Sequence, residues 1–325
     1  MNTGSIFRIG NTSEFNSIAL EAFNYQYNKN LIYKEFSDLL GKNPITVNNA
    51  WEIPFLPIEF FRTEKIFIGD HKPTIVFSSS GTTGMQASKH HINDLAIYIK
   101  SFRLGFKHFY GNIKDYCILA LLPSYLEREG SSLIYMVNDL IQESKHPDSG
   151  FYLNNLKELA HKLQILDNSG SKILLIGVSF ALLDLAEQFP LQLKNTIVME
   201  TGGMKGRRKE MIRTELHSKL KTGFGLHVIH SEYGMTELLS QAYSAGNGIF
   251  YGPPWMKILV RDTEDPLSLQ PHGKTGGINI IDLANIHSCC FLATQDLGKL
   301  HDDGGFEILG RFDNADIRGC NLMVL

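Results

Sequence analysis

Between residues 93 and 229, short apolar runs alternate with stretches of helical periodicity, and this alternation restricts the fold more than any other feature of the chain. The predicted strands span residues 116–122, 172–176, 196–199 and 226–229. The predicted helices span residues 93–109, 131–142, 153–166, 180–188 and 207–220. Continuous apolar strands separated by amphipathic helices indicate a parallel sheet covered by helices on both faces. We therefore expect an α/β fold that binds ligands at the carboxyl ends of its strands.

A loop rich in glycine and hydroxyl groups follows another apolar run at residues 74–77. The loop consists of Ser78, Ser79, Ser80, Gly81, Thr82, Thr83 and Gly84. Glycines let backbone N–H groups approach an anion closely, and the hydroxyl groups add further donors. No Gly-Lys-Ser/Thr follows, so the loop is not a Walker loop. Taken alone, it fits a polar strand-to-helix turn as well as it fits a phosphate site.

The second half of the chain changes character after Glu237. Glycine and proline punctuate short β-type runs at residues 256–260, 277–281, 290–294 and 306–309. Such a pattern indicates a β-rich subdomain. We expect residues 1–237 to form an α/β body that carries the glycine-rich loop, and residues 238–325 to form the β-rich subdomain with a short C-terminal tail.

Composition excludes several classes of function. The formal net charge of -3 gives no basic footprint for nucleic acid or for an anionic membrane. No apolar run is long enough to span a bilayer, and no signal segment is evident. The four cysteines include no C-x-x-C pair, so neither a zinc site nor a disulfide framework is expected. A reducing, cytoplasmic location is the resulting expectation.

Three further segments carry residues suited to a nucleotide. Tyr233 offers a flat face for a base, Thr236 a hydroxyl group for a phosphate, and Glu237 a carboxylate for Mg²⁺. Asp296 can accept hydrogen bonds from ribose hydroxyl groups, and Arg311 can donate a fork of hydrogen bonds to ribose or phosphate oxygens. Each segment alone is also compatible with a turn or a helix cap.

Taken in order with the loop, these segments resemble the adenylate-forming superfamily of acyl-CoA synthetases, firefly luciferase and peptide-synthetase adenylation domains. The resemblance extends over residues 74–319 and implies a large domain of layered parallel sheets with a β-rich subdomain. It also implies ATP and Mg²⁺ as cofactors. It assigns the ATP phosphates to Ser79, Ser80, Gly81, Thr82, Thr83 and Gly84. It assigns adenine, the α-phosphate, magnesium and ribose to Tyr233, Gly234, Thr236, Glu237, Asp296 and Arg311, with an adenine-side loop at Gly202 and Gly203.

The sequence departs from the superfamily pattern at three places. Gln295 stands where a glycine usually precedes the aspartate, and Lys89 follows the loop without the usual proline before it. The superfamily also continues past the Gly-Arg segment into a small domain with a catalytic lysine, which we do not expect here. A shorter branch, the acyl-protein synthetase (LuxE) family, resembles this chain in the proline- and aromatic-rich residues 54–63, the loop and the tail.

The LuxE resemblance implies that a fatty acid is activated as acyl-AMP and loaded onto a cysteine near the carboxyl terminus. By position that cysteine is Cys320, although a cysteine in an apolar tail also fits a small buried hydrophobe. The implied catalytic residues are Cys320, Thr236 and Glu237, with Glu237 as the metal ligand. The implied partners are the acid and a reductase or acyltransferase that receives the acyl group. A truncated acyl- or aryl-CoA ligase and a non-catalytic adenylate-binding protein are the alternatives.

Overall fold

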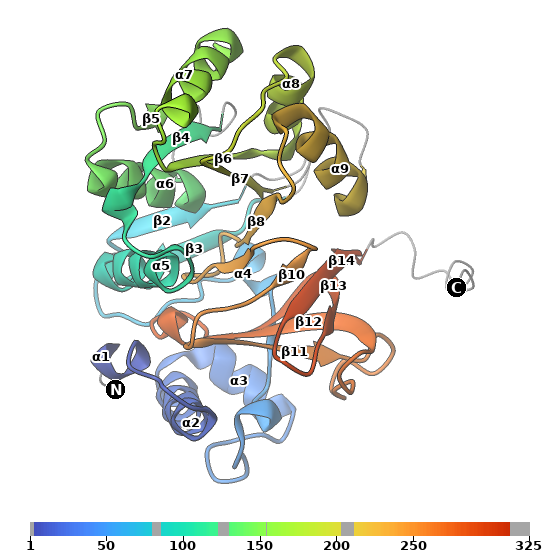
Figure 1. The fold of residues 1–325 in the computed structure, drawn as a ribbon. Coiled ribbons are helices and arrows are strands. Elements are labelled where there is room, and N and C mark those ends of the chain that lie inside the picture. The colour runs from blue at the N-terminus through green and yellow to red at the C-terminus, as the bar shows by residue number, and fades with distance from the viewer. Residues whose placement is uncertain (1–2, 80–85, 123–129, 154, 203–210, 313–325) are drawn as a thin grey trace.

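The computed structural model describes residues 3–79, 86–122, 130–153, 155–202 and 211–312. Within these ranges, the strands form two six-stranded sheets and a two-stranded hairpin. Figure 1 shows the mostly parallel sheet above the antiparallel sheet, with the hairpin between them and the N-terminal helices below. No helix in the described ranges is both long enough and apolar enough to cross a bilayer.

The first sheet is the predicted parallel one. Its strands, in spatial order, are β5 (Gly150–Phe151), β4 (Cys117–Leu121), β6 (Ile173–Val178), β7 (Thr196–Thr201), β8 (His230–Tyr233) and β9 (Ala242–Ser244). All neighbours are parallel except β8 and β9. Every residue of β4 and β6 is buried, which explains their continuous apolar sequences. The α/β fold expected from the alternation is confirmed.

Helices cover this sheet on two sides. They are α5 (Leu95–Tyr110), α6 (Ser132–Ser144), α7 (Leu156–Asn168), α8 (Ser179–Gln188) and α9 (Arg213–Phe224). In Figure 1, α7, α8 and α9 lie above the sheet, and α5 and α6 lie below it. Local chemistry sets the ends of α5: Asp94 accepts the N–H of Ala96 at 2.9 Å, and Gly111 follows the helix with a left-handed φ of 82°.

Two sequence-based boundaries are wrong. The predicted strand 226–229 is a connection, and β8 begins only at His230. The sequence of β8 is polar, so it does not look like a buried strand. Its Ser231 and Glu232 can nevertheless be buried because both have hydrogen-bond partners. The predicted helix 207–220 begins at Arg213, and its residues 207–210 lie outside the described ranges.

The strand before the glycine-rich loop belongs to the hairpin, not to the parallel sheet. β2 (Ile75–Ser78) pairs antiparallel with β3 (Lys89–Ile92), with Phe77 opposite His90. The strand that leads into the glycine-rich loop is therefore separate from the parallel sheet and its carboxyl edge. β2 still touches that edge, because Ser78 N–H donates to the carbonyl of Gly130, in the connection after β4, at 2.8 Å.

The second sheet contains the predicted β-rich runs. Its order is β10 (Ile249–Phe250), β14 (Phe306–Arg311), β13 (Phe291–Leu300), β12 (Thr275–Asp282) and β11 (Met256–Arg261), and β1 (Leu56–Pro57) pairs parallel with β13. The run predicted at 290–294 continues to Leu300, because the same strand carries the Asp296 segment. The division of the chain at residue 237 stays a prediction.

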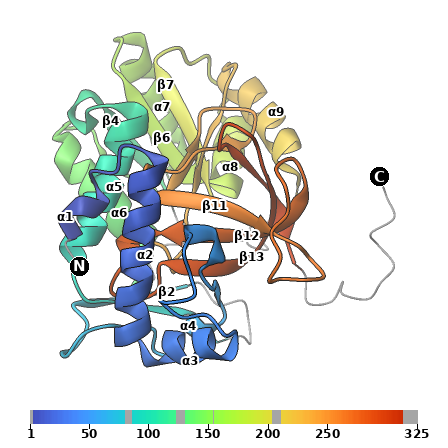
Figure 2. The ribbon, with the colours of Figure 1, turned by 90° about the horizontal axis from the view of Figure 1, so that it is seen from below.

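The N-terminal region is helical. It contains α1 (Thr3–Ile6), α2 (Thr12–Lys29) and α3 (Leu31–Leu39), and shorter helices elsewhere are η1 (Ala50–Glu52), α4 (Phe60–Thr63), η2 (Ile113–Asp115) and η3 (Leu283–Asn285). Buried Gln26 ties α2 to the second sheet. Its Nε2 donates to the carbonyls of Asn285 and Ile286 at 3.0 Å each, and its Oε1 accepts the N–H of Cys290 at 2.9 Å. Figure 2 shows α2 running across this sheet.

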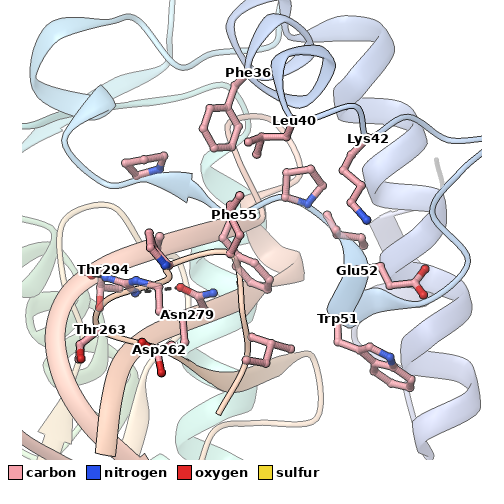
Figure 3. A pocket seen from close by; sticks show the side chains of 18 of the residues that line it. Phe36, Leu40, Lys42, Trp51, Glu52, Phe55, Asp262, Thr263, Asn279 and Thr294 are labelled. Atoms are coloured by element: carbon pink, nitrogen blue, oxygen red, sulfur yellow. Dashed lines mark hydrogen bonds between the residues drawn. The ribbon is translucent and has the colours of Figure 1, made fainter.

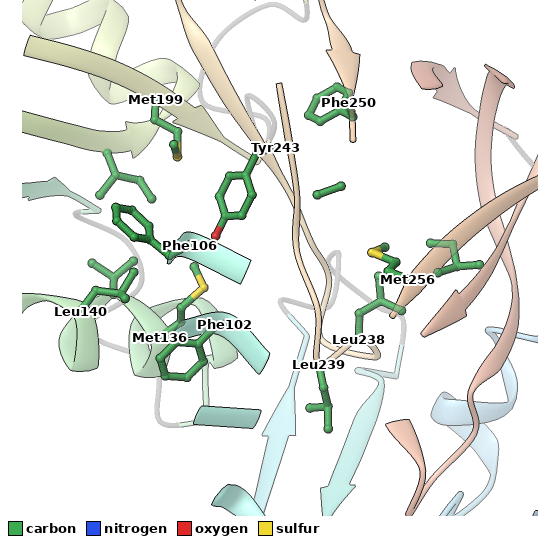
Figure 4. Close-up of a cluster of buried hydrophobic side chains, with 14 of the residues drawn as sticks. Phe102, Phe106, Met136, Leu140, Met199, Leu238, Leu239, Tyr243, Phe250 and Met256 are labelled. Carbon is green, nitrogen blue, oxygen red and sulfur yellow. The ribbon is translucent and has the colours of Figure 1, made fainter. Parts of the chain in front are cut away.

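A buried cluster fills the space between the two sheets. It takes side chains from α5, α6 and β7 on one side and from the chain between β8 and β11 on the other (Figure 4). Leu238 and Leu239 follow directly on Glu237 and are almost fully buried. The candidate site residues around Glu237 are therefore built onto a packed core instead of a free loop.

Candidate active site

Tyr233 and Asp296 meet although they come from different sheets. Tyr233 ends β8, and its hydroxyl group donates to Asp296 Oδ2 on β13 at 2.7 Å. Arg311, at the end of β14, places Nε 3.4 Å from Asp296 Oδ1 and keeps an exposed guanidinium group. Burial raises the pKa of Asp296, and the hydrogen bond from Tyr233 and the charge of Arg311 offset part of that rise. The structure thus brings together the three residues predicted to contact adenosine.

A second layer of hydrogen bonds fixes Asp296. The N–H of Asp296 donates to Thr294 Oγ1 at 3.1 Å, and that hydroxyl group donates to the carbonyl of Ile278 at 2.9 Å. Arg261 donates to the same Ile278 carbonyl at 2.9 Å and also to the carbonyl of Thr294. These contacts occur where the β12–β13 register shifts between Gly277 and Asn279. The irregularity aims the Asp296 carboxylate toward β8.

The turn that carries Thr236 and Glu237 is held through its backbone. His90 on β3 donates from Nδ1 to the carbonyl of Thr236 at 2.8 Å, and Asn285 Nδ2 donates to the carbonyl of Glu237 at 2.8 Å. Just beyond, Asp282 Oδ2 accepts the N–H groups of Leu239 and Ser240 at 2.9 Å each. Three elements therefore hold a segment that has no regular secondary structure of its own.

His90 acts here as a neutral donor. A carbonyl oxygen only accepts, so Nδ1 carries the hydrogen, and Nε2 accepts from the Ser288 hydroxyl group at 2.8 Å. Burial lowers the pKa of His90 to about 4, which keeps the ring uncharged near neutral pH. This role could not be seen in the sequence, because the strand that carries His90 was not predicted.

The ends of the glycine-rich loop lie beside Glu237. Ser79 N–H donates to the carbonyl of Ser88 at 3.0 Å, and Ser88 N–H donates to Ser79 Oγ at 2.9 Å. Burial raises the pKa of Glu237, and a hydrogen bond with the Ser88 side chain offsets part of the rise. The predicted loop residues Ser80, Gly81, Thr82, Thr83 and Gly84 lie outside the described ranges, as do Gly203 and Cys320. Lys89 is exposed at the start of β3.

Two glycines of the predicted site have conformational or steric reasons to be glycine. Gly202 follows β7 with a left-handed φ of 67°, and its carbonyl accepts from the Ser179 hydroxyl group at 2.7 Å. A Cβ atom on Gly234 would lie 2.5 Å from Glu232 Oε1. Gly234 therefore lets the chain pass close to a buried carboxylate immediately after Tyr233.

Two buried carboxylates that the sequence did not single out lie behind the site, on β7 and β8. Burial acts to raise the pKa of Glu200, but His217 and Arg213, 3.6 and 3.5 Å from its Oε1, outweigh it and hold that pKa below its ordinary value. Burial raises the pKa of Glu232 to about 7, although Thr201 donates a hydrogen bond to it. One carboxyl group is thus a stable anion, and its neighbour exchanges a proton near neutral pH.

The sequence matches the family described as acyl-protein synthetase, LuxE, over residues 11–325. The chain belongs to that family. This LuxE family member is 23% identical to a curated relative, the long-chain-fatty-acid–luciferin-component ligase of Vibrio harveyi. That alignment covers 93% of this chain and 84% of the relative.

Solved adenylate-forming ligases share the fold of this LuxE family member. A 2-hydroxyisobutyryl-CoA ligase in its postadenylation state aligns with a TM-score of 0.68 at 12% identity, over 93% of this chain and 68% of that chain. ATP-bound MatB from Rhodopseudomonas palustris aligns with a TM-score of 0.53 at 17% identity. This chain spans 47% of that MatB chain, and the alignment covers 73% of this chain.

The donor set of this LuxE family member suits magnesium better than a structural metal. Among the described residues, no cluster of three or more His, Cys, Asp or Glu side chains has the geometry to hold a metal ion. Glu237 instead presents one buried carboxylate beside the ends of the predicted phosphate loop. Mg²⁺ commonly binds one or two protein carboxylates together with substrate phosphates, so this arrangement fits.

Proposed function

We propose that this protein activates a fatty or other carboxylic acid with ATP and then carries the acyl group on Cys320 as a thioester. Membership of the LuxE acyl-protein synthetase family supports this reaction. The structural observation that carries it is the convergence of Tyr233, Asp296 and Arg311 from two sheets, next to the turn that bears Glu237. An adenylating site needs an aromatic face for the base, a hydrogen-bond acceptor for the ribose, a cation and a metal ligand.

In the first step, a carboxylate oxygen of the acid attacks the α-phosphorus of ATP, and the bond to the leaving pyrophosphate breaks. The product is a mixed anhydride whose acyl carbon is electrophilic. Tyr233 stacks on the base, Asp296 accepts from the ribose hydroxyl groups, and Arg311 donates to ribose or phosphate oxygens. These contacts accelerate the reaction mainly by holding the two reactants in line.

Thr236 and Glu237 act at the phosphates. The Thr236 hydroxyl group donates to the α-phosphate, and the Glu237 carboxylate holds Mg²⁺ against the phosphate chain. When bound, Mg²⁺ neutralises the charge that develops on the phosphate oxygens. The raised pKa of Glu237 describes the carboxylate without a neighbouring cation, and a divalent cation favours its charged form. Ser79 to Gly84 grip the other phosphates in this proposal, with Gly202 and Gly203 on the adenine side.

In the second step, the Cys320 thiolate attacks the acyl carbon. A carbon–sulfur bond forms, the bond from the acyl carbon to the AMP oxygen breaks, and the thiol proton goes to water. The neighbouring Arg318 raises the thiolate fraction. A reductase or acyltransferase would then accept the acyl group, and a cytoplasmic location, where ATP is available, completes the proposal.

The decisive test separates adenylation from transfer. Wild type, Cys320→Ser and the control Cys117→Ala are incubated with ATP, Mg²⁺ and labelled long-chain fatty acid, and acid-dependent ATP–pyrophosphate exchange is measured in parallel. Cys320→Ser should keep the exchange and lose the hydroxylamine-labile label, because a serine hydroxyl group is far less ionised than a thiol. Cys117 is buried on β4, so its variant should keep both.

Each alternative predicts a different pattern. A CoA ligase shows no labelled protein and forms acyl-CoA when CoA is added. A non-catalytic adenylate-binding protein shows no acid-dependent exchange at all. If Cys320→Ser is labelled as strongly as wild type, the assignment of Cys320 is wrong even where adenylation is real.

A further inference from the structure

A cavity of about 650 Å³ lies between the N-terminal region and the second sheet (Figure 3). Its walls come from α3, from η1 and β1, from the connection between β11 and β12, and from β13. The apolar lining residues that matter most are Phe36, Leu40, Trp51, Phe55, Leu269 and Phe312. Lys42, Glu52 and Asp262 add charged groups to the lining. An apolar cavity with a few charged groups suits an amphipathic ligand.

This cavity is separate from the adenosine-binding residues. Its lining does not include Tyr233, Glu237, Asp296 or Arg311. Thr294 and Gln295 in its wall lie next to Asp296 on β13. The cavity and the residues proposed to bind adenosine are therefore distinct sets of side chains that share this strand.

The carboxyl-terminal tail leaves from the wall of this cavity. Phe312 lines it, and Cys320 follows eight residues later, within about 26 Å even at the full extension of about 3.3 Å per residue. A group on Cys320 is thus tethered to the cavity wall by a short segment, and a tether long enough to span the distance gives effective concentrations in about the millimolar range.

An acyl chain on Cys320 needs an apolar site that shields it from water. Every methylene group of a long acyl chain is costly to leave in water, so a tethered chain is driven strongly into any apolar space within reach. We propose that this cavity holds the acyl chain of the Cys320 thioester after it has left the adenylation site. This inference rests on the proposed function, and it adds a second acyl site whose wall includes part of β13.

Tryptophan fluorescence can report on whether this cavity is filled. Of its two tryptophans, Trp51 is 50% exposed in the cavity wall. Trp255 is buried, and its Nε1 donates to Ser101 and Ser240 at 3.1 and 2.9 Å, so its surroundings stay constant. Filling the cavity with an acyl chain should shift the Trp51 emission to shorter wavelength and leave the Trp255 contribution unchanged.

The experiment follows emission and intact mass in the same sample of full-length protein, with ATP, Mg²⁺ and palmitic acid. The emission shift should appear with the time course of the mass increase of one acyl group. Trp51→Phe should acylate normally and show no shift, and palmitic acid brominated along its chain should quench Trp51 in wild type. If the protein is acylated and the Trp51 emission is unchanged, the proposal that the cavity holds the acyl chain is wrong, and the proposed function still stands. No acylation overturns both.

A lining variant tests the consequence for the thioester. Leu269 is 40% exposed in the cavity wall and has no place in the adenylation site, so Leu269→Glu should fold and keep normal pyrophosphate exchange. It should abolish the Trp51 shift and shorten the lifetime of the thioester several-fold, because the acyl chain and its thioester are then exposed to water. The control Ile165→Glu, at an exposed position on α7, should behave as wild type. An unchanged lifetime and shift in Leu269→Glu contradicts the proposal.

Discussion

The hydroxyl group of Tyr233 donates a hydrogen bond to Asp296 across 2.7 Å and so joins the last parallel strand of one sheet to the longest strand of the other. The Tyr233 ring contacts Phe250 and Phe306, and the backbone N–H of Asp296 donates to Thr294 Oγ1. The residues proposed to bind adenosine are therefore held in place by contacts within the protein itself. Such preorganisation lowers the entropic cost of binding.

Tyr233→Phe should raise the KM for ATP in acid-dependent pyrophosphate exchange by between about tenfold and a hundredfold, since a hydrogen bond to a charged group contributes about 1.5–3 kcal/mol. The matched variant Asp296→Asn tests the partner. If the hydrogen bond carries the effect, Tyr233→Phe costs less when combined with Asp296→Asn than it does in wild type. Fully additive effects would show that the two side chains act independently.

Glu237→Gln should reduce pyrophosphate exchange by orders of magnitude, because it removes the negative charge that holds Mg²⁺ and keeps the shape of the side chain. Burial disfavours the charged form of Glu237, so the variant should unfold at the same temperature as wild type or slightly higher. Thermal unfolding and exchange, measured on the same preparation, separate these outcomes. Near-normal exchange would remove Glu237 from the site.

His90 should make folding sensitive to acid. Its pKa falls from the ordinary 6.5 to about 4 on folding, so the unfolded chain binds the proton more readily. Its contribution to stability is complete above pH 6.5 and declines as the pH falls toward 4, by up to roughly 3 kcal/mol. Urea unfolding of wild type and His90→Gln across this range should show a smaller decline for the variant. Parallel pH profiles would contradict the assignment.

Glu232 should act in the opposite direction. Its pKa rises from 4.5 to about 7 on folding, so its contribution is complete below pH 4.5 and is lost as the pH rises through 7, again by up to roughly 3 kcal/mol. Glu232→Gln keeps an acceptor for the Thr201 hydroxyl group and removes the charge. Relative to wild type, the variant should gain stability between pH 4.5 and 8, measured by the same urea titrations. A constant difference between the two proteins would argue against a buried, titrating Glu232.

The sequence predicted the elements whose burial is apolar. β4, β6 and β7 read as strands because they are covered on both faces. The β-rich runs were found as short apolar segments between glycines and prolines, although β11 and β14 are only partly buried. β3 and β8 were missed or displaced because their buried side chains are polar. His90 and Glu232 look like surface residues until their partners, Ser288 and Thr201, are known.

The residues of the candidate site also include some that the sequence could predict and some that it could not. Tyr233, Glu237, Asp296 and Arg311 could be proposed from short motifs, since their spacing within each motif is local. The residues that hold the backbone of these motifs could not. Arg261, Asp282 and Asn285 act through carbonyl and N–H groups of distant segments, and such contacts leave no pattern along the chain.

The pairing of β1 with β13 has a consequence for synthesis. Leu56 pairs in parallel register with Leu292, and the Gln26 side chain makes hydrogen bonds with Asn285, Ile286 and Cys290. On the ribosome, the N-terminal helices therefore emerge long before the strand that completes their contacts. Their apolar faces stay exposed to solvent while the parallel sheet, which is encoded between the two segments, is made and folds. Chaperone demand should thus fall on helices α1 to α3, which are made before the parallel sheet and are among the last parts to be locked in place.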